Sequence, residues 1–202
     1  MSQSKVLADQ LYSGEGVAAD VVRIAAANIL LALCAHIVIP LPFTPVPITG
    51  QTFGVLLVAV MLGARRGGIA LVLYLLEGLA GLPVFQPLGL PGPGRFTGHT
   101  AGYLLAYPFA AFAAGWLVER RANATEPRAF KWPPAGASLA AAILAGEAVI
   151  FLGGCSWLAL GMHLGWPLAI QNGALPFVPG EIIKMASIVA LASGFSLLRR
   201  ES

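Results

Sequence analysis

The chain has 202 residues, of which 57% are hydrophobic and 10% charged, and its formal net charge at pH 7 is +3. Soluble domains carry about 25% charged residues, so this composition excludes an ordinary water-soluble protein and indicates one embedded in a lipid bilayer. The small positive charge requires no nucleic-acid partner, because the placement of the basic residues explains it better.

Residues 1–20 are of mixed polarity and predict a cytoplasmic N-terminal tail or an interfacial helix. They lack a basic n-region and a small-residue cleavage site, so we expect no signal peptide. Residues 21–202 predict a single membrane domain, an all-α bundle of six transmembrane helices. The apolar runs that predict these helices cover residues 21–39, 48–64, 67–82, 98–118, 137–160 and 178–198. The second and third runs are short for a membrane span, and Gly63–Gly68 between them predicts a tight hairpin turn.

The distribution of basic residues predicts the orientation. Ten of the 12 Lys and Arg residues fall on one side of the predicted bundle: Lys5, Arg23, Arg65, Arg66, Arg120, Arg121, Arg128, Lys131, Arg199 and Arg200. The loops of the opposite side contain only Arg95, and Lys184 lies within the last span. Because cytoplasmic loops are enriched in Lys and Arg, we expect both termini in the cytoplasm.

The two outer loops that follow the first and third predicted helices are rich in proline. Each contains four prolines, within residues 40–50 and 83–93, and each is uncharged. Such partly apolar loops are poor water-facing coils and plausible lids over a site, but proline also commonly punctuates the connections between helices. The sequence leaves both interpretations open.

Two opposite charges open the last apolar run. Glu181 and Lys184 are three residues apart, which puts them on one face of a helix. Charged side chains in hydrocarbon are costly and generally face a cavity, so we interpret the pair as part of a binding site. Glu181 alone is also explained as a complement to the positive end of its helix. Lys184 is disfavoured there and needs an anion, either Glu181 or a ligand.

Further polar residues near the outer side extend this candidate site. Arg95 is the only basic residue in an outer loop, and its uncharged surroundings favour a ligand-binding role. A ring of uncharged donors and acceptors is expected close to it: Thr44, Thr49, Gln51, Gln86, His99 and Tyr103. Over an apolar helical bowl, this set suits a small molecule with a fused polar group, an apolar middle and an acidic end.

Several residues have two readings. Glu77 and Glu147 either line the cavity or bond to a neighbouring helix, and for Glu147 we favour the structural role. Cys34 and Cys155 lie within apolar runs and are interpreted as core residues. The first span has a face of small side chains that either packs within the chain or docks a membrane partner: Ala25, Asn28, Ala32 and Ala35. No phosphate-loop, HExxH, CxxC or GxSxG motif occurs, so we expect no enzyme activity, no metal and no cofactor.

Six segments together carry a family resemblance: Pro45–Thr49, Gln51–Leu56, Leu62–Gly67, Gly81–Phe85, Thr97–Pro108 and Pro179–Lys184. In combination they resemble the BioY family, the biotin-specific substrate-binding (S) components of energy-coupling factor (ECF) transporters. The resemblance implies a compact six-helix S-component bundle in a bacterial cytoplasmic membrane that captures biotin from the outer side. It also implies two kinds of partner, a transmembrane coupling protein of the EcfT or BioN type and cytoplasmic ATPases of the EcfA or BioM type, which alone would use ATP.

The resemblance further implies that Arg95, Glu181 and Lys184 contact biotin and that an amide, here Gln86, joins them. With the ring residues Thr44, Gln51 and Tyr103 they form the predicted substrate site. Two features depart from the family pattern. Glu181 stands where the motif usually has Asp, and the alanine motif by which S components dock the coupling protein is only partly matched, at Ala25, Ala32 and Ala35.

One alternative function remains open, a solitary vitamin transporter driven by an ion gradient, with Glu77 or Glu147 as its proton site. The sequence also leaves open whether Arg95 or Lys184 meets the carboxylate of biotin.

Overall fold

Helices dominate the structure, a computed structural model that describes residues 16–124 and 136–198. In chain order the elements are helix α2 (Val17–His36), strands β1 (Val38–Ile39) and β2 (Ile48–Thr49), helix α3 (Gln51–Leu79), the 3-10 helix η1 (Gly92–Thr97), helices α4 (Ala101–Ala124) and α5 (Gly136–Ser156), the π-helical turn η2 (Trp157–Gly161), and helices α6 (Trp166–Gly173) and α7 (Val178–Leu198). Helices suit these apolar runs because every backbone hydrogen bond is then satisfied within the segment, away from water.

The described part of the chain contains four helices long and apolar enough to cross a membrane, namely α2, α3, α4 and α5 extended by η2. A fifth span results if α6 and α7, which meet at a bend of 52°, are counted together. The prediction of six separate transmembrane helices is therefore not confirmed in that form. The predicted boundaries of the last two spans agree closely with α5 to η2 and with α7, whereas the short helix α6 was not predicted.

The second and third predicted helices are joined in α3, which is broken at Gly63. This residue has φ 76° and ψ −173°, a conformation open to glycine but strained for residues with a side chain. The chain then turns back, and a Cβ atom at Gly67 would lie 3.5 Å from the Cα atom of Ala59. The predicted hairpin turn is thus confined to one glycine, and Arg65 and Arg66 belong to the helix after it.

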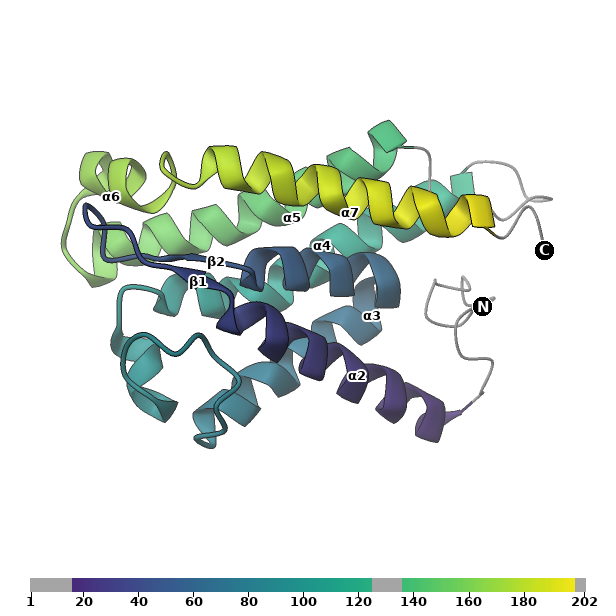
Figure 1. Cartoon of the computed structure of the whole chain (residues 1–202), viewed down its shortest axis with the longest axis horizontal. Coiled ribbons are helices and arrows are strands. Elements are labelled where there is room, and N and C mark those ends of the chain that lie inside the picture. The colour runs from purple at the N-terminus through teal and green to yellow at the C-terminus, as the bar shows by residue number, and fades with distance from the viewer. Residues whose placement is uncertain (1–15, 125–135, 199–202) are drawn as a thin grey trace.

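The ends of the helices fall into two groups (Figure 1). The start of α2, the bend of α3 and the end of α7 lie at one end of the molecule, whereas β1, β2 and α6 lie at the other. At the first end Asp20 forms ion pairs of 2.9 Å with both Arg23 and Arg66. The described basic helix ends are thus gathered as the predicted orientation requires, while the side of the membrane that they face stays a prediction. Five of the predicted cytoplasmic basic residues lie outside the described residues: Lys5, Arg128, Lys131, Arg199 and Arg200.

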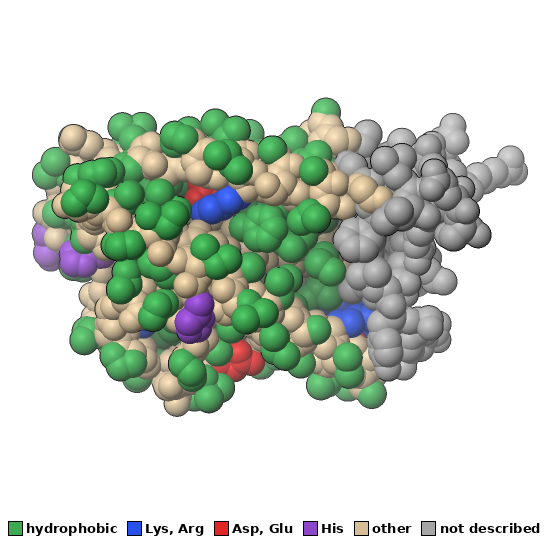
Figure 2. Space-filling view, in the orientation of Figure 1, with side chains coloured by type: hydrophobic (Ala, Val, Ile, Leu, Met, Phe, Trp, Pro, Cys, Tyr) green, Lys and Arg blue, Asp and Glu red, His purple; other side chains and the backbone are tan. Residues whose placement is uncertain are grey.

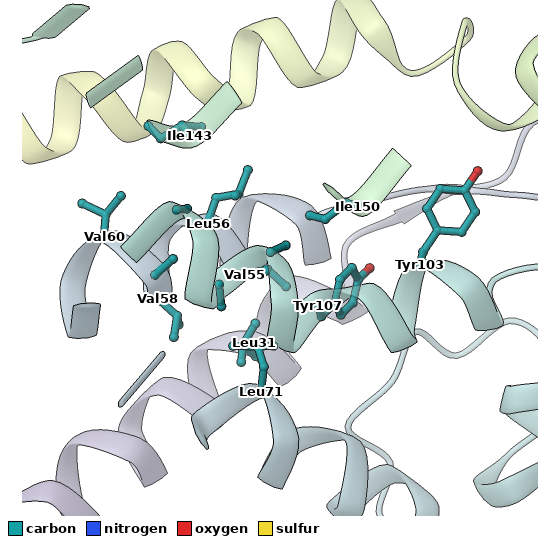
Figure 3. Packing of buried hydrophobic residues seen from close by; sticks show 14 of the residues in the cluster. Leu31, Val55, Leu56, Val58, Val60, Leu71, Tyr103, Tyr107, Ile143 and Ile150 are labelled. Atoms are coloured by element: carbon teal, nitrogen blue, oxygen red, sulfur yellow. The ribbon is translucent and has the colours of Figure 1, made fainter. Parts of the chain in front are cut away.

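The part of α3 before Gly63, its first arm, runs through the centre of the core (Figure 3). Val55, Leu56 and Val58 on this arm are at most 1% exposed, and they pack with Leu31 of α2 and Ile143 of α5. Small residues bring the surrounding helices close together. A Cβ atom at Gly102 of α4 would lie 2.4 Å from the carbonyl oxygen of Gly153 of α5, so only glycine allows this contact.

The outer faces of the helices are apolar, and charged side chains are sparse on the face that Figure 2 shows. Large side chains such as Phe109, Leu33 and Leu152 are 65–70% exposed. A surface of this kind matches lipid rather than water.

The small-residue face predicted for the first span is divided between core and surface in α2. Asn28 and Ala35 are buried, and Asn28 donates a hydrogen bond of 2.8 Å from Nδ2 to Oε1 of Glu77 in α3. Ala25 is exposed and Ala32 is half-buried. Packing within the chain therefore accounts for Asn28 and Ala35, and the docking interpretation retains Ala25.

Candidate substrate-binding site

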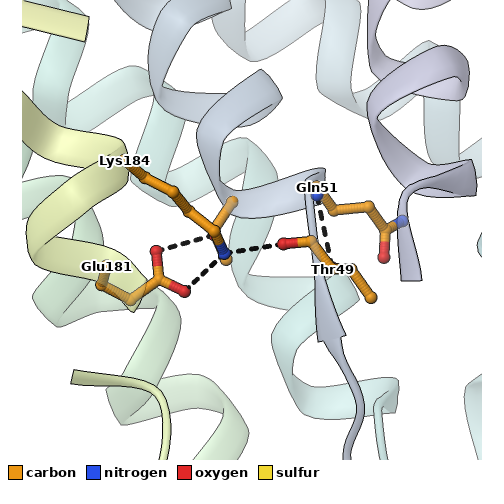
Figure 4. Close-up of polar contacts among 5 residues, drawn as sticks. Thr49, Gln51, Glu181 and Lys184 are labelled. Atoms are coloured by element: carbon orange, nitrogen blue, oxygen red, sulfur yellow. Dashed lines mark hydrogen bonds and ion pairs between the residues drawn. The ribbon is translucent and has the colours of Figure 1, made fainter. Parts of the chain in front are cut away.

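The charged pair predicted in the last span is an ion pair in the first turns of α7 (Figure 4). Nζ of Lys184 lies 2.7 Å from Oε1 of Glu181. The side chains are only 16% and 7% exposed, respectively. Glu181 also lies near the N-terminus of α7, where a negative charge is favourable. Partial burial makes the pair a strong local interaction that neither residue can lose cheaply.

The ammonium group of Lys184 has three protein partners. Besides Glu181, Nζ donates to the carbonyl oxygen of Thr49 at 2.6 Å and to Oγ1 of Thr52 at 2.9 Å. Thr52 in turn donates from Oγ1 to Oε2 of Glu181 at 2.9 Å. An ammonium group has three N–H donors, so all of them are engaged, whereas the carboxylate of Glu181 keeps lone pairs for a further donor.

Thr49 and Thr52, the partners of Lys184 that lie outside α7, are positioned by the short hairpin β1–β2 and the start of α3. Thr49 pairs with Val38 in the antiparallel ladder, and α3 begins two residues later at Gln51. Gly50 between them approaches Cys34 so closely that a Cβ atom would lie 2.5 Å from its carbonyl oxygen. This glycine lets the hairpin dock on α2 and brings Thr49 and Thr52 to α7.

Two neighbouring cavities lie at this end of the bundle, and the ion pair lines the inner one. The inner cavity, of about 40 Å³, is lined by Val46, Pro47, Thr49, Gln51, Thr52, Gln86, Thr100, Tyr103, Leu104, Tyr107, Ile150, Phe151, Phe177, Glu181 and Lys184. The outer cavity, of about 380 Å³, is lined by residues of the two proline-rich loops, by residues within the range 94–100, in η1 and the turn after it, and by Met162. Pro47, Gln86 and Thr100 line both cavities and form the partition between them.

Arg95 borders the outer cavity from η1 and does not line the inner one. Its Nη2 atom donates to the carbonyl oxygen of Gln86 at 2.6 Å, and Nη1 donates to that of Leu88. Burial lowers the pKa of Arg95, but a guanidinium group remains charged at neutral pH. Nε has no hydrogen-bond partner among the described residues, so the group retains capacity for an anion.

The other predicted site residues lie around the same two cavities. Gln51 and Tyr103 line the inner cavity, Thr44 the outer one, and Gln86 both. Thr44, Gln51 and Tyr103 also hold other segments of the chain in place. Tyr103 donates from its hydroxyl to the carbonyl oxygen of Gly173 in α6 at 2.6 Å.

The remaining bonds of these residues fix the loops. Thr44 donates from Oγ1 to the carbonyl oxygen of Asn172 at 2.7 Å, which attaches the loop between β1 and β2 to α6. Gln51 donates to the hydroxyl of Tyr74 at 2.9 Å, and Tyr74 donates to the carbonyl oxygen of Val84 at 2.7 Å. The structure thus gathers all seven predicted residues around two adjoining cavities beneath the predicted lid loops.

Some lining residues were not predicted from the sequence. Thr52 contacts both charges, and the aromatic rings of Tyr107, Phe151 and Phe177 line the inner cavity. A signal was available for Tyr107, which follows Tyr103 by four residues and so shares its helix face. Thr52 lies in the family segment Gln51–Leu56, but its contacts had no local signal, because its partners come from the other end of the chain.

The two acidic residues with open roles differ in the structure. Glu77 accepts the hydrogen bond from Asn28 and lines neither cavity, which agrees with the helix-bonding interpretation. Glu147 is 3% exposed, and neither carboxylate oxygen has a hydrogen-bond partner in the described part of the chain. It lies one helical turn before Ile150 and Phe151, which line the inner cavity. Within residues 16–124 and 136–198, no group of three His, Cys, Asp or Glu side chains is placed to hold a metal ion.

Comparisons with known proteins agree with this architecture. The profile of the BioY family matches residues 3–200. The biotin transporter BioY of Rhizobium etli is 37% identical over 172 residues, which cover 85% of this chain and 88% of that protein. The biotin transporter BioY2 of Lactococcus lactis subsp. cremoris is 34% identical over 175 residues, which cover 84% and 88%.

The fold also matches a solved structure, that of the S-component for biotin from an ECF-type ABC transporter. The TM-score is 0.76 at 24% sequence identity, with 91% of this chain and 92% of that chain covered. The relatives are transporters and not enzymes, which confirms that prediction, and the apolar helices make this chain a multi-pass membrane protein. Because the family profile spans nearly the whole sequence, the chain belongs to the BioY family.

Proposed function

We propose that this chain is a biotin-binding S component, which captures biotin on the outer side of the cytoplasmic membrane and delivers it inward as part of an ECF-type ABC transporter. The observation that carries the proposal is the ion pair of Glu181 and Lys184, which borders a cavity in an otherwise apolar bundle beneath two proline-rich loops. Relatives that cover most of the chain are named biotin transporters, which supports biotin as the ligand.

The donors and acceptors around the two cavities suggest how biotin lies. Lys184 has no N–H donor left for a ligand, whereas Glu181 has lone pairs for an N–H of the ureido group. Arg95 has an unpartnered N–H and suits the carboxylate. We therefore assign the ureido end to the inner cavity and the carboxylate end to the outer cavity.

The apolar middle of biotin suits the wall between these ends. Tyr103, Tyr107, Phe151 and Phe177 line the inner cavity with aromatic surface. Burying the thioether ring and the valeryl chain against such side chains supplies the main non-directional part of the affinity, at about 25 cal/mol per Å².

Binding requires the partition between the cavities to move. Small-molecule pockets are commonly about 300–1,000 Å³, and the inner cavity has about 40 Å³. Pro47 and Gln86, which separate it from the outer cavity of about 380 Å³, both belong to the proline-rich loops. These loops therefore act as lids in the proposal, opening for biotin and then enclosing it.

Delivery to the cytoplasm is assigned to partners. The sequence has no phosphate-binding loop for ATP, so a coupling protein and ATPases would supply the driving force. The rival, a solitary transporter driven by an ion gradient, is favoured by one observation, the buried carboxyl group of Glu147 without a hydrogen-bond partner among the described residues.

Two measurements test the proposal. Calorimetric titration of the purified chain in detergent should detect tight binding of biotin and none of riboflavin, and an absence of biotin binding would refute it. In proteoliposomes, uptake should require ATP together with the coupling protein and ATPases. Uptake by the chain alone that an uncoupler abolishes would establish the ion-gradient rival instead.

A further inference from the structure

We infer that Thr52 is a positioning residue for biotin, whose hydroxyl group holds the ammonium of Lys184 against Glu181 and so sets the carboxylate that receives the ureido group. This inference rests on the proposed function and extends it to a residue outside the predicted site.

The hydroxyl of Thr52 links the two charges in a fixed direction. Its oxygen accepts a hydrogen bond from Nζ of Lys184 at 2.9 Å, and it donates a hydrogen bond to Oε2 of Glu181 at 2.9 Å. A hydroxyl group has a single proton, so ammonium, hydroxyl and carboxylate form one chain of donors. Hydrogen bonds in such a chain polarise one another, and each bond to a charged group is stronger than a neutral one.

A role in starting helix α3 does not account for this hydroxyl. Gly50 is the N-cap residue of α3 and provides no side-chain cap. The hydroxyl of Thr49 instead accepts from the backbone N–H of Gln51 at 3.3 Å. The bonds of the Thr52 side chain go to Glu181 and Lys184 of α7, which line the inner cavity together with Thr52.

The hydroxyl also limits where the ammonium can go. Glu147 of α5 is a second buried carboxyl group, and it lies one helical turn before Ile150 and Phe151, which line the same inner cavity. Without the Thr52 hydroxyl, Lys184 keeps one N–H without an acceptor and Glu181 loses a donor. Fewer hydrogen bonds then hold the ammonium beside Glu181, and the carboxylate loses its orientation toward the ureido group.

The test compares two substitutions and two ligands on the purified full-length chain. Thr52→Val removes the hydroxyl at nearly constant shape, and Thr52→Ser keeps the hydroxyl. We expect Thr52→Val to weaken biotin binding about 10- to 100-fold, as for a lost bond to a charged group, and Thr52→Ser to stay within about threefold of the unsubstituted chain. Biotinamide, which lacks the carboxylate charge, should suffer the same fold-loss, because Thr52 acts at the other end of the ligand.

A hydroxyl elsewhere on α7 provides the control. Ser187 is exposed and donates to the carbonyl oxygen of Ile183 in its own helix, so Ser187→Ala should leave affinity unchanged. If Thr52→Val does not fold, Thr52→Cys replaces it in the test. A thiol is a weak hydrogen-bond donor and acceptor, so we expect this variant to bind biotin weakly too.

Each other outcome overturns the inference. Unchanged biotin affinity in Thr52→Val would show that the hydroxyl has no role. If Thr52→Ser weakens biotin binding as much as Thr52→Val, the shape of the side chain matters and not its hydroxyl. A loss seen with biotin but not with biotinamide would move Thr52 to the carboxylate end. If the unsubstituted chain binds no biotin, the proposed function itself has failed, and the inference falls with it.

Discussion

Each N–H of the Lys184 ammonium group is used within the protein, on Glu181, Thr49 and Thr52. A charge that is taken out of water must recover its lost hydration from such partners. The arrangement therefore stabilises a charge pair in an apolar bundle before any ligand arrives. It also makes Glu181, with lone pairs to spare, the more available of the two groups.

Arg95 tests the assignment of the carboxylate end. Arg95→Lys removes the fork that holds the carbonyl oxygens of Gln86 and Leu88, because a lysine is a single point charge. We expect biotin affinity to fall about 10- to 100-fold and biotinamide affinity to change little. Arg65→Lys, at an exposed position of α3, is the matched control in the same calorimetric titration. An equal loss for both ligands would contradict the assignment.

Glu147 tests whether a buried carboxyl group without a hydrogen bond weakens the fold. Its removal by Glu147→Leu should raise the apparent unfolding temperature in detergent, since an unpaired buried polar group costs about 1–3 kcal/mol. Glu77→Leu should lower it instead, because Asn28 then loses its acceptor. Thermal unfolding of both variants checks the contrast. Destabilisation of the two by similar amounts would mean that Glu147 makes a bond as valuable as that of Glu77.

The charged site residues were easier to single out from the sequence than Thr52, for a physical reason. Glu181 and Lys184 stand out because a charge in an apolar run is costly wherever the chain folds. Thr52 costs little in a helix start and is recognisable only from its contacts with residues 129 and 132 positions away. Such long-range pairing has no local signal. The contacts of all seven predicted residues with biotin remain proposals.

At the level of elements, α3 shows how the structure differs from the sequence-based prediction of a turn at residues 63–68. Glycines and two arginines at residues 63–68 resemble a hydrophilic turn. The structure needs a single residue, Gly63 at φ 76°, to reverse the chain. The N–H of Ala64 that the break exposes is satisfied by Oε1 of Glu119 in α4 at 2.9 Å. This contact lets the next helix begin at once, and a pattern of residue types cannot show it.

The loop between β1 and β2 is the element whose movement the proposal requires. Thr44 attaches this loop to α6 through the carbonyl oxygen of Asn172 at 2.7 Å. Joining the pair Thr44→Cys and Asn172→Cys with a short, cleavable thiol reagent should hold the loop closed. We expect biotin association to slow about tenfold or more, as for other gated sites, and to recover on reduction. Stopped-flow mixing with biotin measures the rate.

The single-cysteine variants treated with the same reagent are the controls for this experiment. Cys34 and Cys155 are buried and free, so they should react little. Association that is equally fast in the cross-linked and reduced proteins would show that biotin reaches the site without movement of this loop.

On the scale of the whole molecule, composition predicted the membrane environment, and the placement of the basic residues predicted the end of the bundle at which we propose the binding site. Few charges and long apolar runs indicate a membrane protein, and the structure covers the helices with exposed apolar side chains. The described basic helix ends gather at the end opposite β1, β2 and α6. That separation leaves the cavities at the basic-poor end, where the proposal needs access from outside. Dependence on a coupling protein arises from contacts between chains, so the contacts within this one chain do not predict it.

Equilibrium binding of biotin to the purified chain, with and without Lys184→Ala, tests most directly whether the ion pair forms the binding site. The substitution leaves Glu181 buried without its cation, which typically costs about 3–5 kcal/mol. We predict tight binding by the unsubstituted chain and a loss of about 100-fold or more in Lys184→Ala. Ile183→Ala, at an exposed neighbour on α7, should bind normally, and all three should remain folded. Equal affinity of Lys184→Ala and the unsubstituted chain would contradict the assignment of the site.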